Sequence, residues 1–242
     1  MGGSVPAHQP LVIRGAVKRF GSRTALGGLD LTVQAGEVYA LLGPNGAGKT
    51  TTINLILGFH EADAGTVMVS GIDSASDPLG ARSRAAYIPE QVALYPDMTG
   101  FQNLRYFTTL AGLSLDEANC ARLLDETGLT REAQHRKAGG YSKGMRQKVG
   151  IAVAIARQAD LLLLDEPTSG LDPSASSDFS HLVRAAADRG TAILMATHDL
   201  YRIKEVANRV GILNGGRIVD EIDPATLDHT ELERIYIERL AA

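Results

Sequence analysis

The stretch Gly43-Pro44-Asn45-Gly46-Ala47-Gly48-Lys49-Thr50 decides the fold of this chain. It matches the phosphate-binding loop pattern G-x-x-x-x-G-K-[ST], in which glycines let the backbone wrap around an anion and successive N–H groups point at phosphates. The apolar residues 38–42 before it predict a buried strand, and residues 51–57 after it predict a helix. The loop therefore has the strand–loop–helix context that phosphate binding requires, with a helix N-terminus aimed at the anion.

Two side chains of this loop have expected roles toward a nucleotide. Lys49 can reach the β- and γ-phosphates, and the Thr50 hydroxyl can ligate Mg²⁺. ATP and Mg²⁺ are therefore the expected cofactors. The expected nucleotide-binding residues of this segment are Gly43, Pro44, Asn45, Gly46, Ala47, Gly48, Lys49, Thr50 and Thr51.

Composition narrows the class of protein. The chain has 242 residues, of which 44% are hydrophobic, so it can bury a sizeable core. Its net charge of −4, without a dense basic stripe, argues against nucleic acid as a partner. Cys120 is the sole cysteine, which excludes an internal disulfide and fits a reducing compartment. Residues 1–10 predict no signal peptide and no apolar run predicts a membrane span, so a role at a membrane requires something else to hold the chain there.

The order of the expected elements predicts an α/β protein. Residues 11–40 show the alternation and turns of strands, and residues 66–69 predict another strand. The pattern is helical from about residue 101 to 158, and from Leu161 onward strands and helices alternate again. Such alternation predicts a parallel sheet flanked by helices, with the helical middle as an insert.

A second motif, Leu161-Leu162-Leu163-Leu164-Asp165-Glu166, predicts a buried strand that ends in two acids. In an open parallel sheet, ligands bind at the carboxyl ends of the strands. Asp165 can hold Mg²⁺ directly or through water, and Glu166 can polarise a water for attack on the γ-phosphate. The alternative is an acidic helix N-cap after a core strand, and the phosphate loop upstream favours the catalytic interpretation.

A third motif, Tyr141-Ser142-Lys143-Gly144-Met145-Arg146-Gln147-Lys148, lies at the start of a helix predicted over residues 143–159. Ser142 is a natural N-cap, so this helix start is a second anion-binding terminus. The segment taken alone favours an ordinary capped helix with a basic, solvated face.

Together these motifs resemble the ATP-binding subunit of ABC transporters over residues 10–220. Their order matches: phosphate loop, helical insert, signature, acidic strand, D-loop at residues 169–172, then His198. The resemblance implies an α/β fold with a P-loop NTPase core, a mainly parallel sheet and an N-terminal antiparallel β subdomain. It also implies an inserted helical subdomain at about residues 92–160 and a C-terminal extension, residues 221–242, with a short amphipathic helix.

The resemblance also implies roles for single residues. Phe20 matches the aromatic that stacks on adenine, and His198 matches the switch histidine that contacts the γ-phosphate. Ser142 and Gly144 match the signature residues nearest the phosphate. The expected catalytic residues are Lys49, Glu166 and His198, and the expected Mg²⁺ ligands are Thr50, Asp165, Glu90 and Gln91.

The sequence departs from the family pattern in two places. In the signature Leu-Ser-Gly-Gly-Gln, Lys143 replaces the first glycine and Met145 replaces the glutamine, a form similar to the ABC-2 type subfamily, which is mostly exporters. Glu90 stands where the Q-loop glutamine is expected, and Gln91 follows it. A carboxylate there can reach Mg²⁺ but adds negative charge beside the γ-phosphate, and either side chain could face the metal.

Two anion sites in one chain favour a head-to-tail dimer in which ATP lies between Lys49 of one copy and Ser142 of the other. The resemblance implies a second partner, a transmembrane permease, which would hold the chain at the cytoplasmic face of the cell membrane. Residues 93–98 could take a permease helix or pack on the chain's own insert.

Other classes of function remain open. A soluble ABC-type ATPase regulating a macromolecule usually carries two nucleotide domains or a long coiled-coil insert, and this chain has neither. A scaffold that binds ATP only to dimerise would not need the catalytic residues, and a small-molecule kinase would not need the Ser142 and His198 motifs. Thr230-Glu231-Leu232-Glu233 predicts a capping box that starts a last amphipathic helix, which could pack on the core or on a second copy.

Overall fold

The computed structural model of the chain describes residues 9–241, so the expectation for the first ten residues falls largely outside that range. Within it the strands form two sheets. The smaller sheet is antiparallel with the order β2-β1-β4-β5, built from β1 (Leu11–Phe20), β2 (Arg23–Val33), β4 (Ala64–Val69) and β5 (Ile72–Asp73). The predicted N-terminal antiparallel β subdomain is confirmed.

The larger sheet has the order β10-β9-β3-β8-β7-β6. Its strands are β3 (Val38–Leu42), β6 (Ala85–Ile88), β7 (Leu161–Asp165), β8 (Ala192–Thr197), β9 (Arg209–Asn214) and β10 (Arg217–Ile222). Neighbouring strands pair in parallel, except that β10 pairs antiparallel with β9. The mainly parallel sheet is therefore confirmed. The expected domain boundary between residues 220 and 221 falls inside β10.

Both faces of the larger sheet are buried at its central strands, which are apolar at nearly every position, whereas the edge strand β10 is only partly buried. Along β3, Tyr39 and Leu41 face a core shared with the antiparallel sheet, whereas Val38 and Leu42 face a core shared with helices. Helix α1 (Lys49–Ile56) contributes Ile53 and its apolar neighbours to the first core. Successive side chains of a strand point to opposite faces, so continuous apolar runs predict a sheet covered on both sides.

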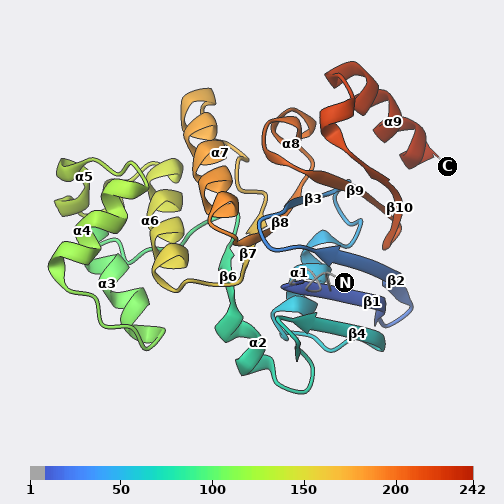
Figure 1. Cartoon of the computed structure of the whole chain (residues 1–242), viewed down its shortest axis with the longest axis horizontal. Coiled ribbons are helices and arrows are strands. Elements are labelled where there is room, and N and C mark those ends of the chain that lie inside the picture. The colour runs from blue at the N-terminus through green and yellow to red at the C-terminus, as the bar shows by residue number, and fades with distance from the viewer. Residues whose placement is uncertain (1–8, 242) are drawn as a thin grey trace, which may run out of the picture.

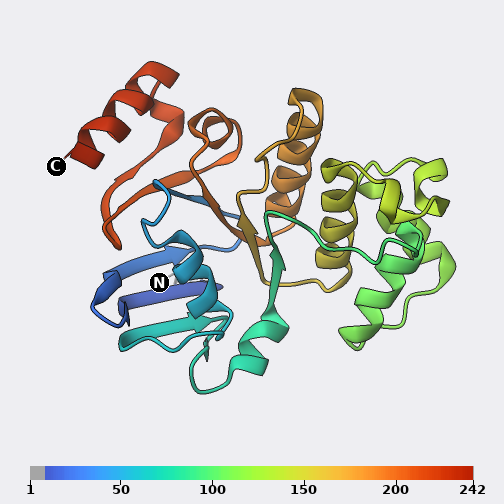
Figure 2. The same cartoon turned by 180° about the vertical axis from the view of Figure 1, so that it is seen from behind.

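The remaining helices fall into three groups. Helix α2 (Pro78–Arg84) precedes β6, and α7 (Pro173–Asp188), α8 (Leu200–Val206) and α9 (His229–Ala241) belong to the C-terminal half. The helical insert comprises α3 (Gly100–Leu110), α4 (Glu117–Glu126), α5 (Arg131–His135), the 3₁₀ turn η1 (Ala138–Gly140) and α6 (Lys143–Ala156). A second 3₁₀ turn, η2 (Pro224–Thr226), precedes α9. The insert has its own apolar cluster, and Figures 1 and 2 show insert and α9 at opposite ends of the molecule.

Two sequence-based expectations about helix ends need correction. The capping box of α9 is made by Asp228 and Glu231, not by Thr230 and Glu233: each carboxylate of the observed pair accepts from the other residue's backbone N–H, at 2.9 and 3.0 Å. Asp228 offers the same three-residue spacing two positions earlier, so Thr230 is already helical. Helix α6 ends at Ala156 rather than residue 159, because Gln158 has a left-handed backbone (φ 48°).

Candidate functional site: a nucleotide cavity at the carboxyl ends of the strands

The phosphate loop joins β3 to α1, and its shape requires glycine. Gly46 and Gly48 have φ angles of 85° and 117°, a region that other residues rarely adopt. A Cβ atom added at Gly48 would lie 2.8 Å from the carbonyl oxygen of Ala25, and one at Gly43 would lie 2.5 Å from that of Leu213. The loop is thus pressed against both sheets, which fixes its path over the start of α1.

The start of α1 is suited to an anion. Its N-cap residue is Gly48, which has no side chain to accept a hydrogen bond from the first turn. The N–H groups at the first turn of any helix lack partners within the helix, and the first-turn residues Lys49, Thr50 and Thr51 line the cavity described below. In α6, by contrast, Ser142 caps the helix by accepting from the Met145 N–H at 3.3 Å, so the predicted N-cap is confirmed.

Lys49 carries a buried charge at this site. Its Nζ atom donates to the carbonyl oxygen of Gly43 at 2.5 Å and lies 3.3 Å from Oε1 of Glu166. The residue is only 6% exposed. Burial of an ammonium group is tolerated when an opposite charge and hydrogen bonds compensate it. These two contacts keep the Lys49 ammonium beside the phosphate loop.

Glu166 lies between Lys49 and His198. Its backbone is left-handed, with φ 44°, and its N–H donates to the carbonyl oxygen of Ala196 on β8 at 2.8 Å. Oε2 lies 3.0 Å from Nδ1 of His198 and accepts from the backbone N–H of His198 at 3.3 Å. The three residues expected to be catalytic, far apart in the sequence, therefore meet around one carboxylate. Non-glycine residues held in this backbone region concentrate at functional sites.

Asp165 is the last residue of β7 and lies beside the same cluster. Burial raises the pKa of Asp165, and the nearby Glu166 carboxylate raises it further, while Lys49 opposes the increase. The hydroxyl of Tyr87 on β6 donates to Asp165 at 3.4 Å. Burial, with a smaller contribution from Asp165, raises the pKa of Tyr87 to about 12, so its hydroxyl stays protonated as a donor.

These elements enclose a cavity of about 470 Å³ at the carboxyl end of β7. Most of the residues expected to bind nucleotide or metal line it, and so does the expected catalytic residue Glu166. The expected ligands that line it are Phe20, Pro44, Asn45, Gly46, Gly48, Lys49, Thr50, Thr51, Glu90 and Asp165. The other predicted site residues are not among the lining residues: Gly43, Ala47, Gln91, Ser142, Gly144 and His198. Glu90 rather than Gln91 therefore faces this cavity.

Sequence reasoning missed two residues of the site. Arg23 lines the cavity, and its Nη2 atom donates to the carbonyl oxygen of Gly46 at 3.3 Å. Tyr87 reaches Asp165 from the neighbouring strand. The position of Arg23, a basic residue directly after the turn that follows Phe20, could have indicated that it belongs to the site. Tyr87 could not be found in this way, because it reaches the site only through the pairing of β6 with β7.

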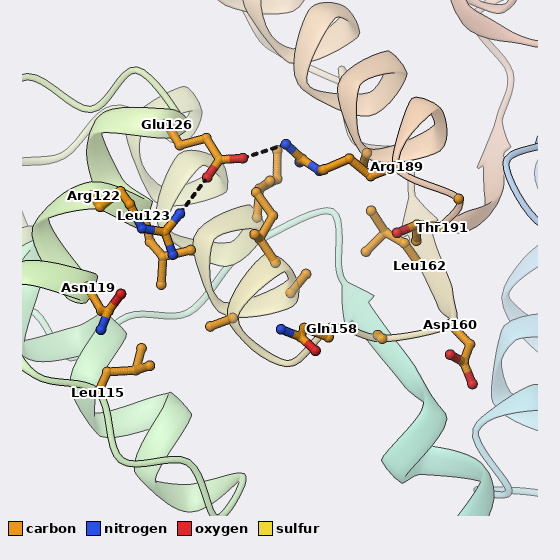
Figure 3. A pocket seen from close by; sticks show the side chains of 17 residues that line it. Leu115, Asn119, Arg122, Leu123, Glu126, Gln158, Asp160, Leu162, Arg189 and Thr191 are labelled. Atoms are coloured by element: carbon orange, nitrogen blue, oxygen red, sulfur yellow. Dashed lines mark hydrogen bonds and ion pairs between the residues drawn. The ribbon is translucent and has the colours of Figure 1, made fainter.

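A second cavity, of about 670 Å³, lies at the other end of β7 (Figure 3). It is bounded by the insert and the core. Glu126 of α4 pairs with Arg122 on the same helix and with Arg189, which follows α7. None of the residues expected to bind nucleotide lines this cavity.

The residues around the smaller cavity fit ATP and Mg²⁺. The open end of α1 and the Lys49 ammonium suit a polyphosphate. Mg²⁺ is usually bound by one or two carboxylates together with phosphate oxygens, and the oxygen donors here are Thr50, Asp165 and Glu90. A phosphate loop after β3 and an acidic pair after β7, on one parallel sheet, define a P-loop nucleotide-binding protein.

Comparison with known proteins identifies the family. The ABC transporter family model matches residues 26–169. An uncharacterized ABC transporter ATP-binding protein of Bacillus subtilis (strain 168), YdbJ, is 39% identical over 96% of this chain and 75% of its own length. The Nod factor export ATP-binding protein I of Burkholderia lata is 38% identical over 95% of this chain and 76% of its own length.

A solved structure, that of the ATP-binding subunit of an ABC transporter, superposes with a TM-score of 0.82 at 31% identity, covering 95% of this chain and 98% of that one. The chain therefore belongs to the ABC transporter family and is an ATP-binding and ATP-hydrolysing subunit of that family. Among the helices of residues 9–241, none combines the length and the apolar character needed to cross a membrane.

Proposed function

We propose that two copies of this chain bind ATP head to tail and that the resulting cycle of closing and opening drives a separate transmembrane permease. The observation that supports it is the position of Ser142. The helix start that it caps does not line the chain's own nucleotide cavity, although its residues match the family signature. A second copy, turned by a twofold axis, can bring that helix start to the triphosphate.

The proposed residue roles follow from the contacts. Lys49 and the amides of residues 43–50 bind phosphate, Glu166 is the general base, and His198 contacts the γ-phosphate. Glu166 pairs with both Lys49 and His198. ATP would replace the carboxylate as the partner of Lys49, which frees Glu166 to orient the attacking water.

Thr50, Asp165 and Glu90 would hold Mg²⁺, which neutralises charge on the β- and γ-phosphates when bound. Burial and the Glu166 carboxylate raise the pKa of Asp165, and a divalent cation beside it would favour its ionised form. Phe20 is 45% exposed and lines the cavity, and its proposed role is to stack on the adenine base.

The permease-docking face that we propose lies on α2 and the end of α3. Leu79 and Leu110 are 73% and 67% exposed and line a shallow depression of about 310 Å³ together with Arg82. The Arg82 guanidinium also lies 5.6 Å from the ring centre of Phe59, another exposed apolar residue. Exposed apolar side chains gathered in this way are typical of an interaction surface. Figure 1 shows α2 and the lower end of α3 on the same side of the molecule.

The stretch 93–98 is a weaker docking candidate than this face. Leu94 packs against the apolar cluster of the insert, and Tyr95 packs edge-to-face on Tyr106 with ring centres 4.8 Å apart. Asn103 also accepts from the Tyr95 N–H at 2.8 Å. These contacts favour the alternative that the stretch packs on the chain's own insert, and we expect it to contribute mainly the rim of the docking surface.

A location at the cytoplasmic face of the cell membrane, reached through the permease, follows from this proposal. Export is the proposed direction, supported by the export function that the name of the Burkholderia relative states and by the Ser142-Lys143-Gly144-Met145 form of the signature.

The test of the dimer uses Glu166→Gln, which removes the general base but keeps the size of the side chain. With MgATP this variant is expected to elute from size exclusion as a dimer, whereas with ADP it remains a monomer. The wild-type chain hydrolyses ATP and so accumulates less dimer. A Glu166→Gln variant that binds MgATP and stays monomeric at micromolar concentration would contradict the proposal. Co-purification with a multi-span membrane protein tests the permease.

A further inference from the structure

The two departures of this sequence from the family pattern meet in the structure. Lys143 replaces a signature glycine and Glu90 replaces the Q-loop glutamine, and the Nζ atom of Lys143 lies 3.8 Å from Oε1 of Glu90. The same Oε1 atom accepts a hydrogen bond from the Ser169 hydroxyl at 3.2 Å. Lys143 in turn donates to the backbone carbonyl oxygen of Ser169. Each of the three residues contacts the other two.

We propose that these three residues, called here the Glu90 clamp, position the Glu90 carboxylate and link it to the start of α6. The inference deepens the proposed function, since it matters only if the α6 start binds the ATP of a second copy. Glu90 lines the chain's own nucleotide cavity, and Lys143 is the first residue of α6. The clamp therefore couples the helix that contacts one nucleotide to a side chain that contacts the other.

The placement of the three residues on separate segments supports a coupling role. Glu90 follows β6, Ser169 lies between β7 and α7, and Lys143 belongs to the insert. Movement of the insert relative to the sheet would change the Lys143–Glu90 distance directly. A glycine at residue 143, as in the usual signature, has no side chain that could make this connection.

Charge gives the clamp a second consequence. The cavity is lined by the carboxylates of Glu90, Asp165 and Glu166 and by two cations, the buried Lys49 and the exposed Arg23. A third carboxylate beside the γ-phosphate opposes binding of ATP by like-charge repulsion. Lys143 supplies the compensating cation, and the Ser169 hydroxyl turns the carboxylate toward it. The glutamine of the usual pattern is neutral and needs no such partner.

The clamp is not expected to contribute much to stability. The side chains of Lys143 and Glu90 are 24% and 49% exposed, and ion pairs this accessible to solvent add at most about 1 kcal/mol to the free energy of unfolding. Its effect should therefore be measured on ATP binding and turnover. This separates a positioning role from a merely structural one.

The experiment is a double-mutant cycle with Glu90→Gln and Lys143→Met. Lysine and methionine have similar lengths, so Lys143→Met removes the charge and keeps much of the shape. With Glu90 present, Lys143→Met is expected to raise the KM for ATP by about fivefold or more. In the Glu90→Gln background the same change should alter KM by less than about twofold, because no carboxylate remains to be neutralised. Raising salt from about 50 mM to about 500 mM should narrow the difference between wild type and Lys143→Met.

Lys137→Gln is the matched control. Lys137 lies in the same insert and pairs with Asp97 at 3.5 Å, but both side chains are largely exposed, at 70% and 93%. Lys137→Gln should leave the KM for ATP unchanged, both with Glu90 present and in the Glu90→Gln background. Equal effects of Lys143→Met with and without Glu90 would overturn the clamp, as would a wild-type KM for Lys143→Met. In either case, ATP hydrolysis by wild type and an ATP-induced Glu166→Gln dimer would still support the proposed function. Loss of those two results would instead count against the proposed function.

Discussion

The Nζ atom of Lys49 lies 3.3 Å from Oε1 of Glu166, and the two side chains are only 7% and 14% exposed. The carboxylate of the proposed general base thus pairs with the cation that we propose to bind the triphosphate. Each charge satisfies the other in a site where neither is well hydrated. Removal of one charge therefore leaves the other without its partner.

Lys49→Ala should destabilise the nucleotide-free protein by about 2 to 3 kcal/mol, because Glu166 is left with less charge compensation in a buried site. The double variant Lys49→Ala/Glu166→Gln should recover most of this loss, since it removes both charges. Urea unfolding of the three proteins without nucleotide measures the difference. If the double variant is as unstable as Lys49→Ala, the loss of stability does not come from the uncompensated charge of Glu166. Neither variant is expected to hydrolyse ATP.

Gly48→Ala should abolish ATP binding and lower the free energy of unfolding by about 2 kcal/mol or more. The added Cβ would lie 2.8 Å from the Ala25 carbonyl oxygen, at a φ of 117°. Gly140→Ala is the matched control, because a Cβ added at Gly140 would meet no atom within 4 Å and its φ is not positive. Isothermal titration with ATP and urea unfolding check both variants. Normal ATP affinity in Gly48→Ala would mean that the loop is not fixed as described.

Ser142 allows the capping role to be separated from the proposed contact with a second copy. Asparagine and aspartate cap helices as well as serine does, so Ser142→Asn and Ser142→Asp should both keep the wild-type stability to within about 0.5 kcal/mol. Only aspartate places a negative charge where the partner's triphosphate is proposed to lie. In the Glu166→Gln background, Ser142→Asp should lose the ATP-induced dimer and Ser142→Asn should retain part of it. Analytical ultracentrifugation distinguishes them, and dimers of equal affinity would exclude the contact.

Short-range patterns account for what the sequence could predict. The phosphate loop, the acidic end of β7 and the Ser142 cap each occupy a few consecutive residues, and local backbone preferences decide their structure. The parallel sheet followed from apolar runs and the order of elements, whereas the separate antiparallel subdomain came from the family resemblance. The roles of Phe20 and His198 came from the family resemblance, because a single aromatic or histidine carries no such signal by itself.

Contacts between distant segments could not be predicted in the same way. The meeting of Lys49, Glu166 and His198 depends on β3, β7 and β8 being neighbours in the larger sheet. The pairing of Lys143 with Glu90 depends on how the insert is placed against the sheet. Even the α9 cap was misplaced by two residues, because Asp228 and Thr230 offer the same local pattern and only the observed hydrogen bonds distinguish them.

Tyr39 leads to a prediction about alkaline pH. Burial raises the pKa of Tyr39 far above its ordinary value, and its hydroxyl donates to Glu221 at 2.7 Å. The pKa of Tyr39 in the folded protein lies above the value of about 10 in the unfolded chain. The contribution of the Tyr39 hydroxyl to stability is therefore fully present below pH 10, and it is lost as pH rises further because only the unfolded chain releases the proton. The free energy of unfolding of wild type should therefore fall by about 1.4 kcal/mol more than that of Tyr39→Phe for each pH unit above about 10. Urea unfolding from about pH 9 to about pH 11 measures this, and parallel curves would contradict it.

The exposed leucines of α2 and α3 give a prediction that separates docking from catalysis. Leu79→Asp puts an acid in the first turn of α2, and Leu110→Lys puts a base at the last residue of α3, so each charge suits its helix end and folding should be preserved. Both side chains lie outside the nucleotide cavity, and the basal ATPase rate of the isolated subunit should stay within about twofold of wild type, as is usual for surface substitutions.

Val219→Asp, on the edge strand β10, is the control, since Val219 is also apolar and 43% exposed. In detergent extracts, the two leucine variants should lose co-purification of the permease while Val219→Asp retains it. A single charge in the centre of an apolar contact costs about 2 kcal/mol or more of binding free energy. If all three variants still co-purify with the permease, the docking face does not lie on α2 and α3.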